Sequence, residues 1–207
     1  MVAAWSGLTT DQVFNVFVTR HSPLSLAVDD MARVYRNYDW ESNFQPSNVY
    51  ADLPLTLRCN PIVALAALDI SELLEFSLPE SLKHNKDFAL AAVSRTRAYY
   101  TILQHFDASL YNDEEVVLKA VERNDREMFY ASSTLATSRT FVLKAVSVNG
   151  LCIRQILPEF QSDKEAALAA VRQNTAAFKY LCDTLQADKD IQEACRAAET
   201  ATQTGID

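Results

Sequence analysis

The sequence predicts an all-α protein: a short α-solenoid of about six 25-residue helical hairpins that follows a non-repeat N-terminal helical cap. Composition is the first reason. The chain of 207 residues is 49% hydrophobic but contains only 3 glycines and 6 prolines, and it is rich in alanine, which loses no side-chain entropy in a helix. The second reason is a motif that recurs about every 25 residues. The third is the set of polar residues at the ends of each copy.

Residues 1–56 do not follow the repeat, and they contain two predicted helices. The first lies in the stretch T-T-D-Q-V-F-N-V-F-V-T-R. The second begins with Ser22 as its N-cap and Pro23 as its first helical residue, a position that proline favours. An irregular aromatic segment follows, and it is too long to serve only as a connecting loop in a compact domain.

Four aromatic residues of this segment are the candidate binding residues: Tyr38, Trp40, Phe44 and Tyr50. Exposed aromatic side chains supply a large contact area at a small entropic cost. In the alternative interpretation they pack over the open end of the first repeat and cap it, because an uncapped solenoid end exposes apolar surface. The sequence leaves both interpretations open.

Residues 57–198 form the predicted helical repeat array. One leucine per copy aligns the copies, with a glutamate in the last: Leu65, Leu90, Leu118, Leu143, Leu168 and Glu193. The intervals are 25, 28, 25, 25 and 25 residues. Two residues later every copy has a small side chain: Ala67, Ala92, Ala120, Ala145, Ala170 and Cys195. A small residue at a fixed place in an apolar helical face indicates that a neighbouring helix approaches closely there.

Each copy is predicted to start with a helix of about eleven residues, close to three turns. Ser162 with Glu165, and Asn112 with Glu115, have the spacing of a capping box. Three asparagines, six residues after the aligned leucine, suit the left-handed turn that ends a helix; they are Asn124, Asn149 and Asn174. A second, shorter apolar segment in each copy predicts a B helix that packs back on the first.

Two copies depart from the regular length or composition. The 28-residue interval places three extra residues between Leu103 and Leu110, where a longer loop or an extra helical turn is expected. In the last copy Glu193 and Arg196 replace apolar residues, as a C-terminal capping repeat requires. Residues 199–207 are predicted to be a frayed polar tail.

The copies D-K-E-A-A-L-A-A-V-R-Q-N, D-E-E-V-V-L-K-A-V-E-R-N and N-K-D-F-A-L-A-A-V-S-R-T resemble the short helical repeats of a domain of unknown function with the pattern D-K-x-x-x-L-x-A-V-x-x-N. The resemblance covers about residues 57–198. Such repeats are frequent in protists and in intracellular bacteria, where they include candidate secreted effectors. The resemblance implies an all-helical scaffold used for protein contact, and it brings no catalytic residues.

Charge and cysteine usage restrict the environment and the partners. The net charge of −8 and the pI near 4.9 oppose binding to nucleic acid or to acidic membranes. No apolar run approaches the roughly 20 residues that span a bilayer. Four cysteines form no C-x-x-C pair and favour a reducing environment; they are Cys59, Cys152, Cys182 and Cys195. The protein is therefore expected inside the cell, in the cytosol, or in a host cytosol if it is a secreted effector.

The sequence contains no motif for a zinc site, a nucleophile or a phosphate-binding loop, so no catalytic residue, cofactor or metal is predicted. Three isolated histidines are interpreted as surface residues: His21, His84 and His105. The preferred hypothesis is a scaffold that binds another protein and regulates, inhibits or positions it. The alternative is an enzyme or enzyme subunit with its site between the N-terminal segment and the first repeats, where Cys59 is the nucleophile considered.

Overall fold

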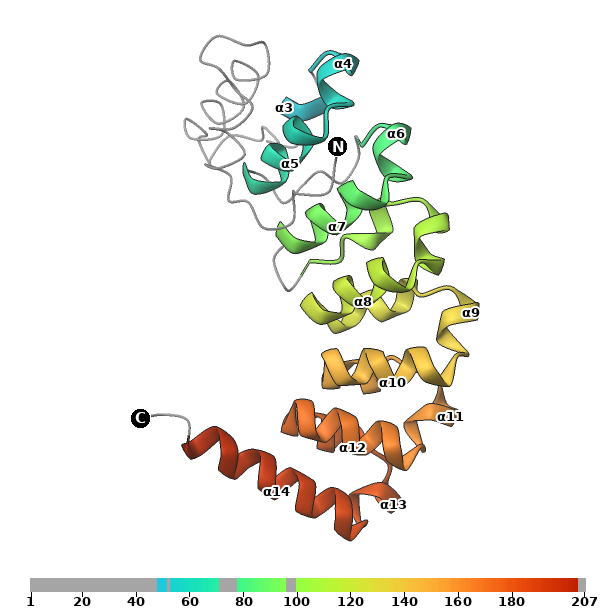
Figure 1. Ribbon diagram of the computed structural model, residues 1–207, viewed down its shortest axis with the longest axis vertical. Coiled ribbons are helices and arrows are strands. Elements are labelled where there is room, and N and C mark those ends of the chain that lie inside the picture. Colours follow the sequence, from blue (N-terminus) through green and yellow to red (C-terminus); the bar gives the residue numbers. More distant parts are fainter. Residues whose placement is uncertain (1–47, 52, 71–77, 96–99, 205–207) are drawn as a thin grey trace. The chain divides into compact units, whose positions relative to one another are not determined.

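The computed structural model describes residues 48–51, 53–70, 78–95 and 100–204, and every regular element in these ranges is helical (Figure 1). The predicted all-α class is confirmed for this part of the chain. The two helices predicted near the N-terminus lie outside the described residues. The chain divides into two compact units, Met1–Asp107 and Ala108–Asp207. This division lies inside the predicted array, in the stretch with the 28-residue interval.

The described part of the first unit twice shows a four-residue helix followed by a ten-residue helix. Its elements are α3 (Asn48–Ala51), α4 (Leu55–Arg58), α5 (Pro61–Ile70), α6 (Glu80–Lys83), α7 (Lys86–Arg95) and the 3₁₀ helix η1 (Leu103–His105). The apolar faces of α5 and α7 pack together. The η1 turn lies where the three extra residues of the long interval were expected to add a loop or a helical turn.

The second unit repeats one order of elements: a ten-residue α-helix, a 3₁₀ helix and a four-residue α-helix. The ten-residue helices are α8 (Glu114–Arg123), α10 (Arg139–Val148) and α12 (Lys164–Gln173). The 3₁₀ helices that follow them are η3 (Asp125–Tyr130), η4 (Gly150–Arg154) and η5 (Thr175–Tyr180). The short helices are α9 (Ser133–Ala136), α11 (Pro158–Gln161) and α13 (Asp183–Gln186). The unit begins with the 3₁₀ helix η2 (Ala108–Asn112) and ends with α14 (Lys189–Thr204).

Figure 1 shows α8, α10, α12 and α14 side by side, with α9, α11 and α13 along one edge of this row. Four residues of each ten-residue helix are buried: Val116, Val117, Ala120 and Val121 in α8; Phe141, Val142, Ala145 and Val146 in α10; Ala166, Ala167, Ala170 and Val171 in α12. The predicted small-residue column thus lies in the core of this unit up to Ala170. Adjacent helices approach closely there because a methyl group leaves room.

The second segment of the copies in the second unit differs from the predicted B helix. In η3, η4 and η5 it is a 3₁₀ helix of five or six residues, and a separate four-residue α-helix follows it. Short segments form few of the i to i−4 hydrogen bonds of an α-helix, and 3₁₀ helices occur mainly in such pieces. The aromatic and cationic side chains of these segments therefore follow a three-residue turn.

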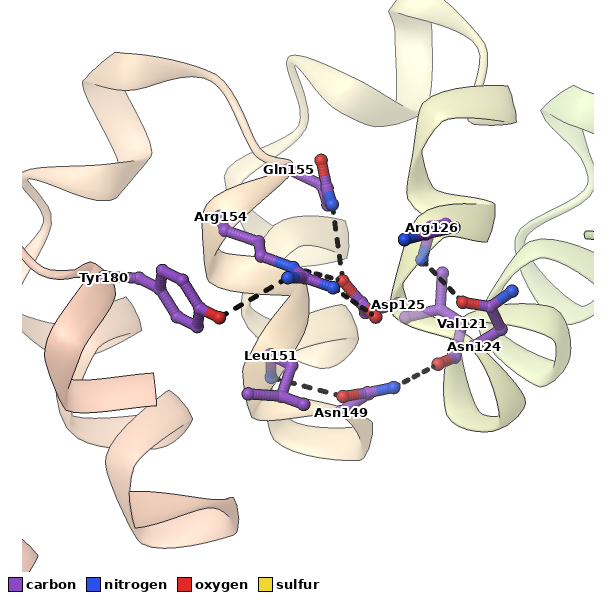
Figure 2. Close-up of polar contacts among 9 residues, drawn as sticks. All are labelled: Val121, Asn124, Asp125, Arg126, Asn149, Leu151, Arg154, Gln155 and Tyr180. Carbon is purple, nitrogen blue, oxygen red and sulfur yellow. Dashed lines mark hydrogen bonds and ion pairs between the residues drawn. The ribbon is translucent and has the colours of Figure 1, made fainter. Parts of the chain in front are cut away.

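The three asparagines do not adopt the left-handed conformation that the sequence predicted. Their φ angles are −148°, −146° and −151°, so their backbone is extended. Each side-chain oxygen instead accepts a hydrogen bond from a backbone N–H at the start of the following 3₁₀ helix, as Asn149 does from Leu151 at 3.2 Å. The Asn149 amide also donates to the Val121 carbonyl at 2.7 Å, which links two copies (Figure 2). Asparagine serves here as an N-cap of the next element.

The N-caps of α8 and α12 lie one residue later than the predicted capping boxes. Asp113, Ser138 and Asp163 cap α8, α10 and α12. Asp163 Oδ1 accepts from the backbone N–H of Glu165 at 2.8 Å and of Ala166 at 3.3 Å. Ser162 instead ends α11, and its hydroxyl donates to the Pro158 carbonyl. The boxes proposed for Ser162 and Asn112 are therefore wrong, and the cap column continues with Asn60, Asn85 and Asp188.

Substitution of the adjacent residues Ser162 and Asp163 tests which of them is the N-cap of α12. Asp163→Ala is expected to lower the free energy of unfolding by about 1 kcal/mol, because two N–H groups of α12 lose their acceptor and the exposed Arg139 side chain loses a carboxylate partner. Ser162→Ala is expected to change it by less than about 0.5 kcal/mol, since the hydroxyl makes one weak exposed bond. Urea denaturation of the two variants measures the difference. A larger loss for Ser162→Ala would restore the predicted box.

The last helix is longer than the sequence analysis proposed. Glu193 and Arg196 are exposed, as expected for the end of the array. However, α14 continues to Thr204, into the stretch predicted as a polar tail from residue 199. Residues 205–207 lie outside the described part of the chain.

Candidate interaction surface

The structure describes one of the four aromatic residues predicted to bind a partner. Tyr50 is 4% exposed, and its hydroxyl donates to the Arg58 carbonyl at 2.6 Å. Burial raises the pKa of Tyr50 above its ordinary value. Tyr50 is therefore buried within the first unit, and the choice between capping and binding stays a prediction. Tyr38, Trp40 and Phe44 lie outside the described residues, so their role in binding stays a prediction.

The four cysteines are free thiols in different surroundings. Cys59 is half-buried just after α4, and His21 lies outside the described residues. Burial raises the pKa of Cys152 to about 12. Cys182 is exposed, and a hydrogen bond with the Thr184 hydroxyl lowers its pKa. Within the described ranges no three His, Cys, Asp or Glu side chains gather as they would around a metal ion.

The two histidines that the structure describes have neighbours of different kinds. His84 Nδ1 lies 3.2 Å from an Asp107 carboxylate oxygen, and His84 is about half exposed. The His105 ring stacks on Tyr100, with ring centroids 5.8 Å apart. Both residues belong to the first unit. Their contacts are those of partly exposed surface side chains, as the sequence analysis expected.

The second unit presents a different kind of surface on its 3₁₀ helices, which pack next to one another from η3 through η4 to η5. We call the outward side chains of these helices the 3₁₀ surface: Arg126, Phe129, Tyr130, Arg154, Gln155, Lys179 and Tyr180. Phe129 is 68% exposed. Its ring lies largely in water, and an exposed aromatic side chain offers a large contact area at a small entropic cost.

Arg154 connects the three helices of this surface. Its Nε donates to Asp125 Oδ2 at 2.7 Å, and a terminal nitrogen donates to Oδ1 at 3.1 Å (Figure 2). The Gln155 amide adds a longer bond of 3.4 Å to the same carboxylate. Because Asp125 is on η3 and Arg154 on η4, this bidentate pair holds adjacent copies in register. Its hydrogen bonds with Asp125 raise the pKa of Arg154.

Tyr180 extends this connection to η5. The second terminal nitrogen of Arg154 donates to the Tyr180 hydroxyl at 3.4 Å, and the guanidinium carbon lies 5.4 Å from the centre of the ring. Lys179 Nζ lies 4.9 Å from the same centre, and its hydrogen bond lowers the pKa of Tyr180. Two cations thus contact one aromatic ring, a favourable arrangement of charge and ring quadrupole.

On the three 3₁₀ helices the basic side chains are exposed and the acidic side chains are buried. Their exposed charged residues are Arg126, Arg154 and Lys179, whereas their acidic residues Asp125 and Glu127 are 8% and 1% exposed. The ten-residue helices differ, because their exposed charges include ion pairs between copies. Lys144 pairs with Glu114 at 2.6 Å, and Arg139 pairs with Asp163 and Glu165. The 3₁₀ surface is therefore the cationic and aromatic part of an otherwise mixed unit.

Sequence reasoning assigned these segments to packing and did not single out the surface. Phe129, Arg154 and Lys179 occupy the same place in three successive copies, 25 residues apart. Their chemical variety was the available signal, since positions that build the core keep their character from copy to copy. The position before them does so, with Met128, Ile153 and Phe178.

Removal of the Arg154 side chain and removal of the Asp125 side chain are expected to lower the free energy of unfolding by different amounts. Arg154→Ala leaves the Asp125 carboxylate, whose side chain is 11% exposed, with the Gln155 amide as its remaining side-chain donor. An unsatisfied buried acceptor costs roughly 1 to 3 kcal/mol. Asp125→Ala is expected to cost less, because the Arg154 side chain is 33% exposed and can turn to water. Thermal and urea denaturation check the order, and equal losses would contradict it.

The described residues include no helix with the length and apolar character needed to cross a bilayer. No curated protein and no solved structure matches the chain. Residues 113–161 and 138–186 match the model of a family described as Domain of unknown function (DUF4116). Each match begins at an N-cap residue, Asp113 or Ser138. The second is displaced from the first by 25 residues, the length of one copy. Residues 113–186 of this chain are thus similar to repeats of the DUF4116 family.

Proposed function

We propose that this chain is a short α-solenoid scaffold of about six repeats that binds another protein through the 3₁₀ surface of its second unit. The observation that carries the proposal is the conjunction of Phe129, 68% exposed, with the Arg154 and Tyr180 cluster on neighbouring helices. Aromatic and arginine side chains dominate the binding energy of protein interfaces. Repeat arrays offer such contacts because each copy adds outward positions on the same scaffold.

The copies of the second unit share their buried and N-cap positions but differ at one outward position, and this pattern supports the proposed function. Buried valine and alanine positions and the N-cap residues keep the same character in α8, α10 and α12. The outward position of the 3₁₀ helices instead carries Phe129, Arg154 and Lys179. A constant framework with variable outward residues allows the surface to suit one partner without a change in the fold.

The test uses a double variant that alters the surface and spares the core. Phe129→Ala with Lys179→Ala removes two exposed side chains. Proteins captured by the wild-type chain under native conditions are identified, and the affinity of each purified partner is measured for both forms. The proposal expects binding to weaken by about tenfold or more, as for truncation of interface hot spots.

A matched control lies on the ten-residue helices. Thr140→Ala with Ser147→Ala removes two exposed side chains from α10, and this variant is expected to bind as the wild type does. Failure to find any partner under native conditions would contradict the scaffold function. A partner lost equally by both variants would contradict the assignment to the 3₁₀ surface.

A further inference from the structure

We infer that the 3₁₀ surface takes an acidic protein segment that also carries a large apolar side chain. This inference rests on the proposed function and specifies the chemistry of the partner. Its starting point is the contrast between the surface and the whole chain. The chain has a net charge of −8, yet every exposed charge on η3, η4 and η5 is positive. Complementary charge steers the approach of partners and suppresses wrong ones.

The three cations of the 3₁₀ surface differ in how many of their N–H groups remain for a partner. Arg154 uses Nε and one hydrogen of each terminal nitrogen on Asp125 and Tyr180. A guanidinium has five N–H groups, so two remain for another acceptor. Among the described residues neither Arg126 nor Lys179 forms an ion pair. A carboxylate of a partner therefore finds donors on all three 3₁₀ helices.

The apolar contact point lies on the first of these helices. Phe129 occupies on η3 the place that Arg154 occupies on η4 and Lys179 on η5. Because these helices are neighbours, a segment that runs across them along this position meets an aromatic ring on η3 and cationic groups on η4 and η5, with Arg126 also on η3. A ligand with a large apolar residue followed by Asp or Glu has matching groups in this order. Burial of both partners' apolar groups supplies affinity, and the charges supply orientation.

A nucleic acid fits the same features less well. Phosphate backbones are held by several cations in a row, whereas one of the three cations here is already bidentate to Asp125. The net charge of −8 on the whole chain also repels a polyanion. A protein segment carries fewer charges and tolerates this environment.

The test selects binders without assuming their composition. A random-peptide display library is panned against the full chain, and enriched peptides are synthesised and their affinities measured. The inference expects Asp and Glu next to a large apolar residue to be enriched. Raising the ionic strength from about 0.1 to 1 M, which shortens the Debye length from roughly 10 to 3 Å, is expected to weaken these peptides.

Charge reversal locates the binding. Lys179→Glu is expected to weaken an enriched peptide by about tenfold, because a carboxylate then faces a carboxylate. Lys119→Glu is the control with the same change in charge, on an exposed residue of α8 paired with Glu122, and it is expected to have little effect. Circular dichroism of both variants verifies that they remain folded.

The possible failures are distinguishable. Enrichment of neutral or basic peptides would overturn the inference and leave the scaffold function standing, and so would equal weakening by the two reversals. Tight binding of a single-stranded oligonucleotide that Lys179→Glu abolishes would replace the acidic protein by a nucleic acid. If no peptide is enriched and native capture also yields no partner, the proposed function fails together with the inference.

Discussion

Gly150→Ala is expected to lower the free energy of unfolding of the second unit by about 1 to 3 kcal/mol. A Cβ at this position would overlap the carbonyl oxygen of Ala170 and lie 3.1 Å from its carbonyl carbon. The obstacle is backbone of α12, so no side-chain rotation relieves it. The helical advantage of alanine over glycine, roughly 0.5 to 1 kcal/mol, offsets only part of this cost. Urea denaturation followed by circular dichroism measures the change.

Thr175 provides the control for this substitution. It follows Asn174 as Gly150 follows Asn149, and it already carries a Cβ. Thr175→Ala is therefore expected to change the free energy of unfolding by less than about 0.5 kcal/mol. An unchanged denaturation midpoint for Gly150→Ala would show that η4 and α12 are farther apart than the structure places them.

Ala145→Leu is expected to destabilise the second unit by about 1 to 3 kcal/mol. Ala145 is fully buried on α10, and α10 packs against both α8 and α12. A leucine there adds three carbon atoms where neighbouring helices approach most closely, so side chains must leave their preferred rotamers or the helices must separate. The denaturation midpoint and the calorimetric melting temperature report the loss.

The same substitution on the outer face of α10 separates crowding from helix propensity. Ser147 is exposed, and Ser147→Leu is expected to stay within about 0.5 kcal/mol of the wild type. A stability of Ala145→Leu equal to that of Ser147→Leu would mean that the small-residue column does not set the spacing of the helices.

The features that the sequence predicted well depend on local periodicity. Apolar side chains recur on one face of each ten-residue helix, and burial of Ala120, Ala145 and Ala170 follows from that face meeting its neighbours. Polar caps were harder to place. Ser162 and Asp163 are both suitable N-cap residues, and the choice depends on where α11 ends, which the spacing of residues does not report.

Prediction of the 3₁₀ surface required telling an outward apolar residue from a buried one, which hydrophobicity alone does not do. Met128 and Phe129 are adjacent apolar residues, so hydrophobicity alone does not tell which of them faces the core. In η3 Met128 is 3% exposed and Phe129 68%, since consecutive side chains of a three-residue turn point about 120° apart around the helix axis. The chemical variety of Phe129, Arg154 and Lys179 could have marked the outward position, but which apolar residue of η3 occupies it depends on the fold.

The asparagine and glutamine bonds between copies affect how the second unit unfolds. The Asn149 amide donates to the Val121 carbonyl, whereas Gln173 accepts from the Gly150 N–H at 2.6 Å and donates to the Val148 carbonyl at 3.2 Å. Melting of a single interior copy would strip these partners from backbone groups on both sides, which are costly to leave unsatisfied. In a linear array such coupling penalises partly folded states. The second unit is thus built to lose its structure in one cooperative transition, in which no copy melts alone.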